Sequence, residues 1–109
     1  MTPGEVLEAL ERTLAERRDA PPGTSYTASL YAGGTDAILK KLGEEAAEVL
    51  IAAKNDGEDA LVHELADLWY HAQVLMAQRG IPLSRLTDEL AGRMNRSGLE
   101  EKAARGGGS

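Results

Sequence analysis

Apolar residues recur at intervals of three and four along most of the chain, a pattern typical of amphipathic helices. The first expected helix runs from about Pro3 to Arg17, because Thr2 and Glu5 match a capping box with proline at the first helical position. Residues 19–24, DAPPGT, then interrupt the pattern, since proline removes a backbone donor and disfavours helix at the preceding residue. We interpret the next segment, SYTASLYAGG at 25–34, as a short helix.

Three further helices are predicted after this segment. The first can be capped by Thr35 or Asp36 and should end near Lys54. The second spans about residues 59–78, and the third begins near Pro82. The last helix is expected to turn four apolar residues inward: Leu83, Leu86, Leu90 and Met94.

The composition favours an all-α fold of four to five helices. The chain has 109 residues, enough for one domain, with no Phe and one Trp, so its core should consist of aliphatic helix faces. We expect a single domain over residues 1–105, followed by a Gly-rich tail at 106–109 that carries no fold signal.

Charge and cysteine content limit the ligands and the location. The 12 basic and 18 acidic residues give a net charge of −6, which argues against electrostatic binding of nucleic acid. A phosphate-rich ligand would therefore have to bring a cation, and without cysteine the metal ligands must be oxygen or imidazole. No apolar run approaches the roughly 20 residues of a membrane span, so we expect no membrane contact and a cytoplasmic protein.

Five acidic residues are predicted to converge on one face of a helical hairpin. Glu44, Glu45 and Glu48 lie on adjoining rows of one helix, and Glu64 and Asp67 share a face of the next. A short turn makes these helices antiparallel, with Glu48 and Glu64 each eight residues from its centre and Glu45 and Asp67 each eleven. At a rise of about 1.5 Å per residue, each carboxylate meets its counterpart at the same height.

Such a cluster is costly when it is fully ionised and empty. Two unit charges ~4 Å apart repel by roughly 4 kcal/mol at an effective dielectric near 20. Either the pKa values rise or a cation neutralises the carboxylates, and hard oxygen ligands suit Mg²⁺, with Mn²⁺ as a substitute. A solvated acidic helix face is the alternative, but matching positions on two helices favour a metal site.

The sequence around these acids resembles a known enzyme family. The pattern EExxE at 44–48, followed by ExxD at 64–67, is similar to the signature of the all-α nucleoside triphosphate pyrophosphatase superfamily, which includes MazG proteins and dimeric dUTPases. Within it, the text at 25–55, 64–81 and 97–105 resembles the phosphoribosyl-ATP pyrophosphatase family. The acid pattern indicates only the superfamily, whereas the longer blocks indicate the family.

The resemblance implies a MazG-like helical bundle and Mg²⁺-dependent hydrolysis of phosphoribosyl-ATP to phosphoribosyl-AMP and pyrophosphate, the second step of histidine biosynthesis. No Ser, Cys or His nucleophile with a base is evident, so we expect direct attack by water. Carried over by position, the implied catalytic residues are Glu44, Glu45 and Glu48. The implied metal ligands are Glu45, Glu48, Glu64 and Asp67, while Glu44 is either a further ligand or a group that orients the attacking water.

Five residues are candidates for substrate binding. Lys41 and Lys54 either contact phosphate or are ordinary lysines, exposed or paired with nearby glutamates. His71 lies on the acidic stripe of its helix and can bond substrate, although a lone histidine beside an apolar face is more often structural. Tyr26 and Ser29 belong to the short expected helix, a block that helps hold the substrate in the resembled family.

The helix expected at 59–78 is apolar over most of its circumference, because Tyr70 and Val74 add to an already broad apolar side. A second copy of the chain can cover the excess, so we expect a homodimer, as the resemblance also implies. Trp69 and Tyr70 are then core or dimer contacts rather than a platform for base stacking, and His63 is a surface residue.

Two other functions are compatible with part of this pattern. A house-cleaning pyrophosphatase of the MazG type would act on free or noncanonical nucleotides, and a non-enzymatic helical dimerisation module would leave the acids solvated. The block at 25–34 favours the phosphoribosyl-ATP family over the first, and the alignment of acids disfavours the second. Some family members are fused to a cyclohydrolase with a cysteine zinc site; since this chain has no cysteine, we expect the free-standing form.

Overall fold

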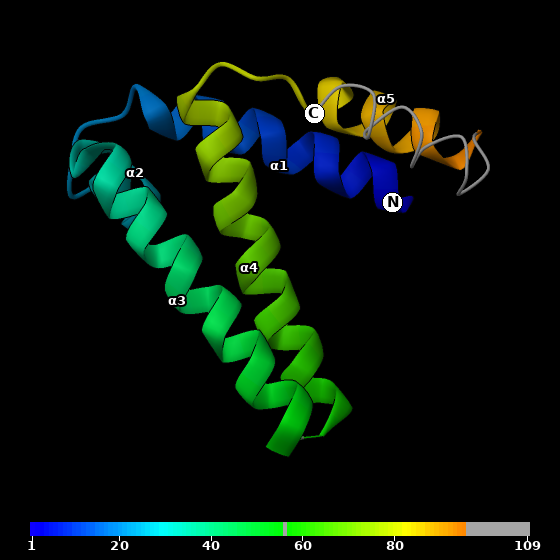
Figure 1. Cartoon of the computed structure of the whole chain (residues 1–109). Helices are drawn as coiled ribbons and strands as arrows, with labels where there is room; N and C mark the ends of the chain where they lie inside the picture. The colour runs from blue at the N-terminus through cyan, green and yellow to red at the C-terminus, as the bar shows by residue number, and fades with distance from the viewer. Residues whose placement is uncertain (56, 96–109) are drawn as a thin grey trace, which may run out of the picture.

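A computed structural model describes residues 1–55 and 57–95 of the protein. These ranges contain five helices and no strand (Figure 1): α1 (Pro3–Arg18), α2 (Tyr26–Ala32), α3 (Gly34–Asn55), α4 (Glu58–Gln78) and α5 (Leu83–Met94). The all-α prediction is confirmed, and none of these helices is long and apolar enough to cross a bilayer. The tail expected at 106–109 and the family-like text at 97–105 lie outside the described residues.

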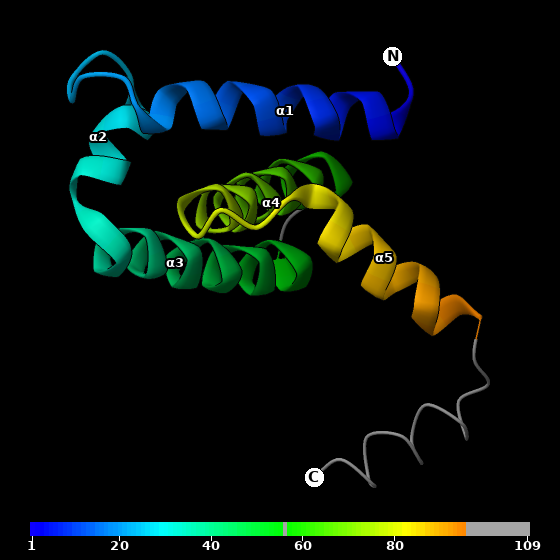
Figure 2. The same ribbon diagram turned by 90° about the horizontal axis from the view of Figure 1, so that it is seen from above.

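Helices α3 and α4 form an antiparallel hairpin that projects as an arm from the other helices (Figure 1). Helix α1 crosses the base of this arm, and the short α2 leads directly into α3 (Figure 2). The first turn of α5 packs on the N-terminal half of α1, and the rest of α5 diverges from it. The other described helices therefore cover the base of the arm and leave its outer part open.

The core lies where the first four helices meet at the base of the arm. Each of α1, α2, α3 and α4 contributes one buried aliphatic side chain: Leu14, Leu30, Ile38 and Val74. Two hydrogen bonds to backbone carbonyls support this packing: Arg18 Nη1 donates to Ala77 at 2.9 Å, and the Tyr31 hydroxyl donates to Leu14 at 3.2 Å. The core thus fixes α2, α3 and α4 relative to one another, and these helices carry the predicted site.

The capping box of α1 and the short helix α2 are confirmed, but the start of α3 differs from the prediction. The Glu5 amide donates to the Thr2 hydroxyl at 3.1 Å, and the Thr2 amide donates to the Glu5 carboxylate at 3.0 Å. Helix α3 begins at Gly34, whose φ of +83° lets the chain turn within one residue after α2. Thr35 therefore lies inside the helix instead of capping it, and its hydroxyl accepts from the Gln78 side chain at 2.8 Å.

The inward orientation predicted for α5 is correct at its start and wrong further along. Leu83 is buried, whereas Leu90 and Met94 are 47% and 79% exposed, because α5 diverges from α1. Pro82 occupies the N-cap position and offers no side-chain acceptor. The carboxylate of Glu11 in α1 takes that role and accepts from the Leu83 amide at 2.6 Å.

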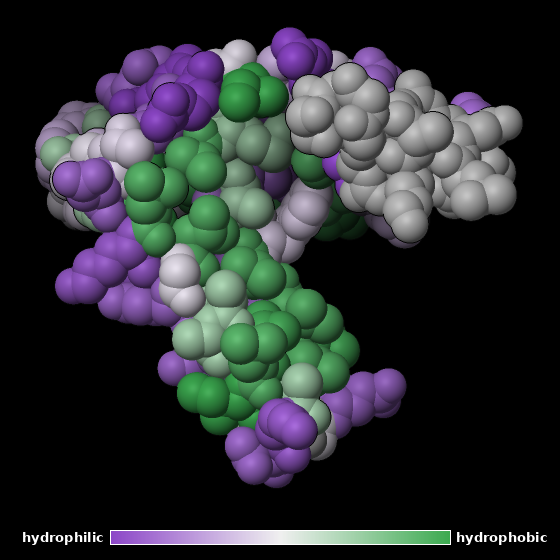
Figure 3. Space-filling view, viewed as in Figure 1, coloured by the Kyte–Doolittle hydropathy of each residue, from purple (hydrophilic) through white to green (hydrophobic). Residues whose placement is uncertain are grey.

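The arm presents an apolar surface to solvent. Figure 3 shows apolar side chains spread over the outer part of the hairpin, on the face seen in Figure 1. Large apolar side chains on α3 and α4 remain between 45% and 69% exposed: Leu39, Leu50, Ile51, Val62 and Leu65. Patches of this kind on a helix pair commonly mark a protein interface.

Candidate active site

The tightest acidic group lies on α4. His63, Glu64 and Asp67 each offer one ligand atom within 4.8 Å of the others. The spacings of three and four residues put these side chains on one face of the helix, and His63 Nε2 lies 3.4 Å from Asp67 Oδ2. His63 is exposed, as expected, but its membership of this group was missed, although its spacing of four from Asp67 already placed it on the same stripe.

On α3, one lysine lies between two of the predicted catalytic carboxylates. The Lys41 ammonium is 3.3 Å from Glu44 Oε2 and 3.6 Å from Glu45 Oε1, one turn along the helix. The pKa of Lys41 is raised most by its hydrogen bond to Glu44 and next by the nearby phenol of Tyr26. The Glu45 side chain is only 13% exposed, whereas that of Glu44 is 47% exposed, so Glu45 is the more buried of the two.

Acids of α3 act on Glu64 of α4 across the hairpin. The pKa of Glu64 is raised most by partial desolvation and next by the negative charge of Asp67. Glu45 and Glu48 on α3 raise it further. His63 lowers the pKa of Glu64. Glu45 and Glu48 lie outside the tight α4 group, so they share its electrostatic field without closing into a single cage of ligands.

The raised pKa of Glu64 predicts that the metal-free protein loses stability as pH rises. Between the ordinary glutamate pKa and this raised one, the folded chain binds more protons than the unfolded chain, so unfolding becomes easier with increasing pH. In excess chelator, lowering the pH from about 7 to about 5 should raise the Tm of the wild type more than that of Glu64→Gln, whose side chain does not titrate. Thermal unfolding over a pH series measures this; parallel curves for the two proteins would contradict it.

Two of the predicted substrate residues meet each other at the inner end of the acidic face. His71 follows Asp67 by one turn of α4 and is buried, with 5% exposure. Its Nε2 is 2.8 Å from the Tyr26 hydroxyl, and its Nδ1 is 2.7 Å from the Asp67 carbonyl oxygen. Tyr26 is 54% exposed, and burial, offset by the charge of Lys41, raises its pKa. Both ring nitrogens of His71 are therefore engaged, while Tyr26 remains accessible.

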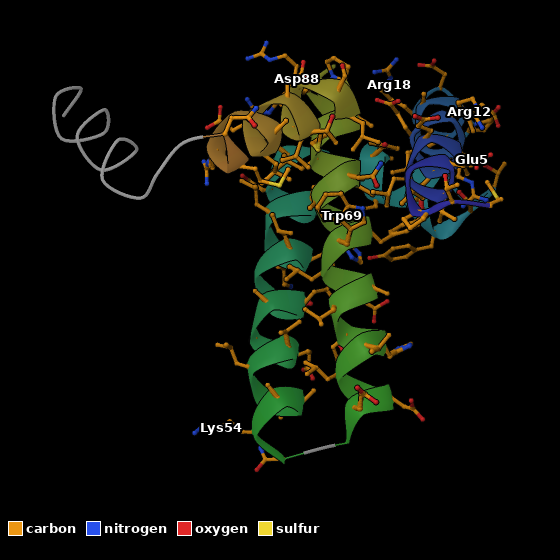
Figure 4. The ribbon with its side chains drawn as sticks, turned by 90° about the vertical axis from the view of Figure 1, so that its right-hand side faces the viewer. Glu5, Arg12, Arg18, Lys54, Trp69 and Asp88 are labelled. Carbon is orange, nitrogen blue, oxygen red and sulfur yellow. The ribbon has the colours of Figure 1, made fainter. Side chains whose placement is uncertain are left out.

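Of the remaining candidates, Ser29 makes a local bond and Lys54 lies far from this point. Ser29 Oγ accepts from the Gly23 amide at 3.0 Å and so ties α2 to the loop before it. Lys54 lies at the far tip of the arm and points away from α4 (Figure 4). Trp69 lies toward α1 in the same view, and its indole donates to Gln73, whose amide in turn donates to the Leu7 carbonyl at 3.4 Å. The indole bond of Trp69 thus lies within α4, and Gln73 is the residue that links α4 to α1; the role of Trp69 as a core or dimer contact stays a prediction.

Comparison with known proteins identifies the family of this arrangement. A family model described as phosphoribosyl-ATP pyrophosphohydrolase matches residues 7–94, which include the whole acidic face. The chain belongs to this family.

Curated relatives agree with membership of the phosphoribosyl-ATP pyrophosphohydrolase family. The chain is 50% identical over 101 residues to the phosphoribosyl-ATP pyrophosphatase of Methylococcus capsulatus, covering 93% of this chain and 96% of that one. It is 49% identical over 100 residues to the enzyme of the same name from Trichlorobacter lovleyi, covering 92% and 93%. The corresponding protein of Neisseria meningitidis is 47% identical over 100 residues, covering 92% and 94%. The resemblance found in the sequence is confirmed over nearly the full length of these proteins.

Proposed function

We propose that this protein hydrolyses phosphoribosyl-ATP to phosphoribosyl-AMP and pyrophosphate, the second step of histidine biosynthesis. The observation that carries the proposal is the family match over residues 7–94, together with relatives of that name at about half identity. The relatives do not favour the alternative of a house-cleaning pyrophosphatase. A non-enzymatic dimerisation module is also disfavoured, because the relatives are named as enzymes.

The acidic face fits a divalent metal ion. Its donor set is oxygen with one imidazole. Partial desolvation raises the pKa of Glu64 most, and the neighbouring carboxylates raise it further, a repulsion that a cation would relieve. We propose that Glu45, Glu48, Glu64 and Asp67 hold Mg²⁺, or Mn²⁺ in its place. When bound, the ion would supply to the phosphate oxygens a positive charge that the carboxylates of the acidic face lack.

The chain's own residues then orient the substrate and the attacking water. Glu44 is the most exposed of the α3 acids that lie near Lys41, and we assign it to orienting water or to the metal. Lys41 already pairs with Glu44 and Glu45, so it approaches phosphate only as part of that ion-paired group. Tyr26 reaches the same place from α2. With no nucleophilic side chain proposed, water attacks phosphorus directly.

We also propose a homodimer that works in the cytoplasm and binds no nucleic acid. The exposed apolar side chains of the arm support the dimer, because a second copy of the hairpin has the same apolar surface to offer. The net charge of −6 opposes binding to a nucleic acid backbone. A phosphorylated nucleotide substrate is formed and consumed inside the cell, which supports the location.

The direct test is incubation of the protein with phosphoribosyl-ATP and Mg²⁺, with measurement of released pyrophosphate. We expect turnover that stops in excess chelator and a kcat/KM at least about 100-fold higher than for ATP, dUTP or dCTP, since recognition of a second sugar phosphate adds several polar contacts. Comparable rates on dUTP or dCTP would instead support the house-cleaning function.

A further inference from the structure

Two adjacent hydrogen bonds join the first turn of α2 to the middle of α4. The Tyr26 hydroxyl meets His71 Nε2 at 2.8 Å, and the next residue, Thr27, meets the hydroxyl of Tyr70 at 2.6 Å. Thr27 and His71 are 1% and 5% exposed, whereas Tyr26 is 54% exposed. Tyr70 is partly buried, so Tyr26 is the most accessible of these four side chains to a substrate on the acidic face.

The hydrogen bonds of His71 fix which atom of Tyr26 is free to bind. A carbonyl oxygen only accepts, so the contact of 2.7 Å with the Asp67 carbonyl puts the proton on Nδ1. In a neutral imidazole the other nitrogen then accepts, and the Tyr26 hydroxyl donates to Nε2. The imidazole packs edge-on against the rings of Tyr26 and Tyr70, with ring centroids 5.8 Å and 5.7 Å apart, and this packing holds it in this orientation. Tyr26 thus presents oxygen lone pairs and no free proton.

The position of Tyr26 decides what those lone pairs can recognise. Its phenol is close enough to Lys41 and Glu45 for both charges to act on it, so it borders the proposed phosphate and metal site. An acceptor cannot hydrogen-bond to phosphate oxygens, which are acceptors themselves. It can bind hydroxyl or N–H groups of the nucleoside part of the substrate.

We propose that Tyr26 accepts a hydrogen bond from a donor in the nucleoside part of the substrate, and that His71 is a positioning residue which orients Tyr26 from the interior. This inference rests on the proposed function and assigns different roles to two residues that the sequence analysis named as substrate-binding candidates. The Thr27–Tyr70 bond joins the same turn of α2 to α4 without involving Tyr26 or His71, so it serves as an internal control.

Steady-state kinetics with phosphoribosyl-ATP and Mg²⁺ test the two roles. Tyr26→Phe should raise KM roughly tenfold and leave kcat within about twofold, because a bond made equally in ground and transition states affects binding alone. His71→Asn keeps a donor near the Asp67 carbonyl but offers Tyr26 no acceptor, and should raise KM to the same extent. His71→Gln puts an amide oxygen near the position of Nε2, and should keep KM within about twofold of the wild type.

Tyr70→Phe is the matched control, because it removes the neighbouring α2–α4 hydrogen bond and keeps the ring. It should lower the Tm while leaving KM unchanged. A KM increase in Tyr70→Phe as large as that in Tyr26→Phe would mean that any loosening of α2 has this effect, and would overturn the proposal. An unchanged KM in Tyr26→Phe would overturn it as well.

A substrate-free measurement separates failure of this inference from failure of the proposed function. The chain has two histidines, so ¹⁵N NMR of the imidazoles can be assigned with the His71→Gln variant. We expect His71 to carry its proton on Nδ1, with an Nε2 shift that changes in Tyr26→Phe and stays constant in Tyr70→Phe. A proton on Nε2 would overturn the positioning role regardless of activity. If the NMR result holds and the wild type releases no pyrophosphate from phosphoribosyl-ATP, it is the proposed function that fails.

Discussion

Glu48→Gln and Asp67→Asn are each expected to lower pyrophosphate release from phosphoribosyl-ATP by at least about 100-fold, since even residues behind metal ligands cost 10–100-fold when they are changed. Each substitution keeps the shape of the side chain and removes one charge from the acidic face. Helical circular dichroism should remain that of the wild type. In excess chelator the Tm should stay equal or rise, because a like-charge repulsion on Glu64 has been removed.

Glu16→Gln is the matched control, because it makes the same chemical change at an exposed position of α1, outside the arm. It should retain wild-type turnover. Full activity in both single variants, Glu48→Gln and Asp67→Asn, would contradict the assignment of these carboxylates to a metal site. Wild-type activity that persists in excess chelator would contradict it as well.

The second large effect is expected at the outer part of the arm. The double variant Leu50→Gln/Val62→Gln should convert a dimer into a monomer, with the mass in light scattering falling to the chain mass of 11.6 kDa. These side chains are 69% and 58% exposed in the single chain. In a symmetric interface each substitution counts twice, and losing four such burials costs on the order of 6 kcal/mol. Glutamine adds no charge near the acids, so any loss of activity would follow from the lost partner.

Leu50→Met provides the control for this experiment, because it keeps apolar area and volume at the same position. It should remain dimeric and active. A wild-type protein that is folded, active and monomeric at micromolar concentration would refute the dimer, and the exposed apolar surface of the arm would then need a different partner.

The sequence by itself determined the features that depend on neighbours along the chain. The capping box of Thr2 and Glu5, the helix periods, and the spacing of three and four within each acid cluster follow from helix geometry alone. The short turn before α4 was enough to predict that Glu45 and Glu48 would influence Glu64, because a tight connection leaves two helices little freedom except to lie antiparallel. The family could also be predicted from the sequence, because family resemblance depends on the order of residues along the chain.

Only the tertiary structure decided contacts between segments far apart in the sequence. Glu11 caps α5 across 72 positions, and Tyr26 meets His71 across 45. No periodicity encodes such pairs, because they depend on the angles at which loops set one helix against another. The same reason explains Leu90 and Met94: their spacing placed them correctly on one face of α5, but the divergence of α5 from α1 left that face uncovered. Helix geometry fixes which side chains share a face, and packing between helices fixes what that face meets.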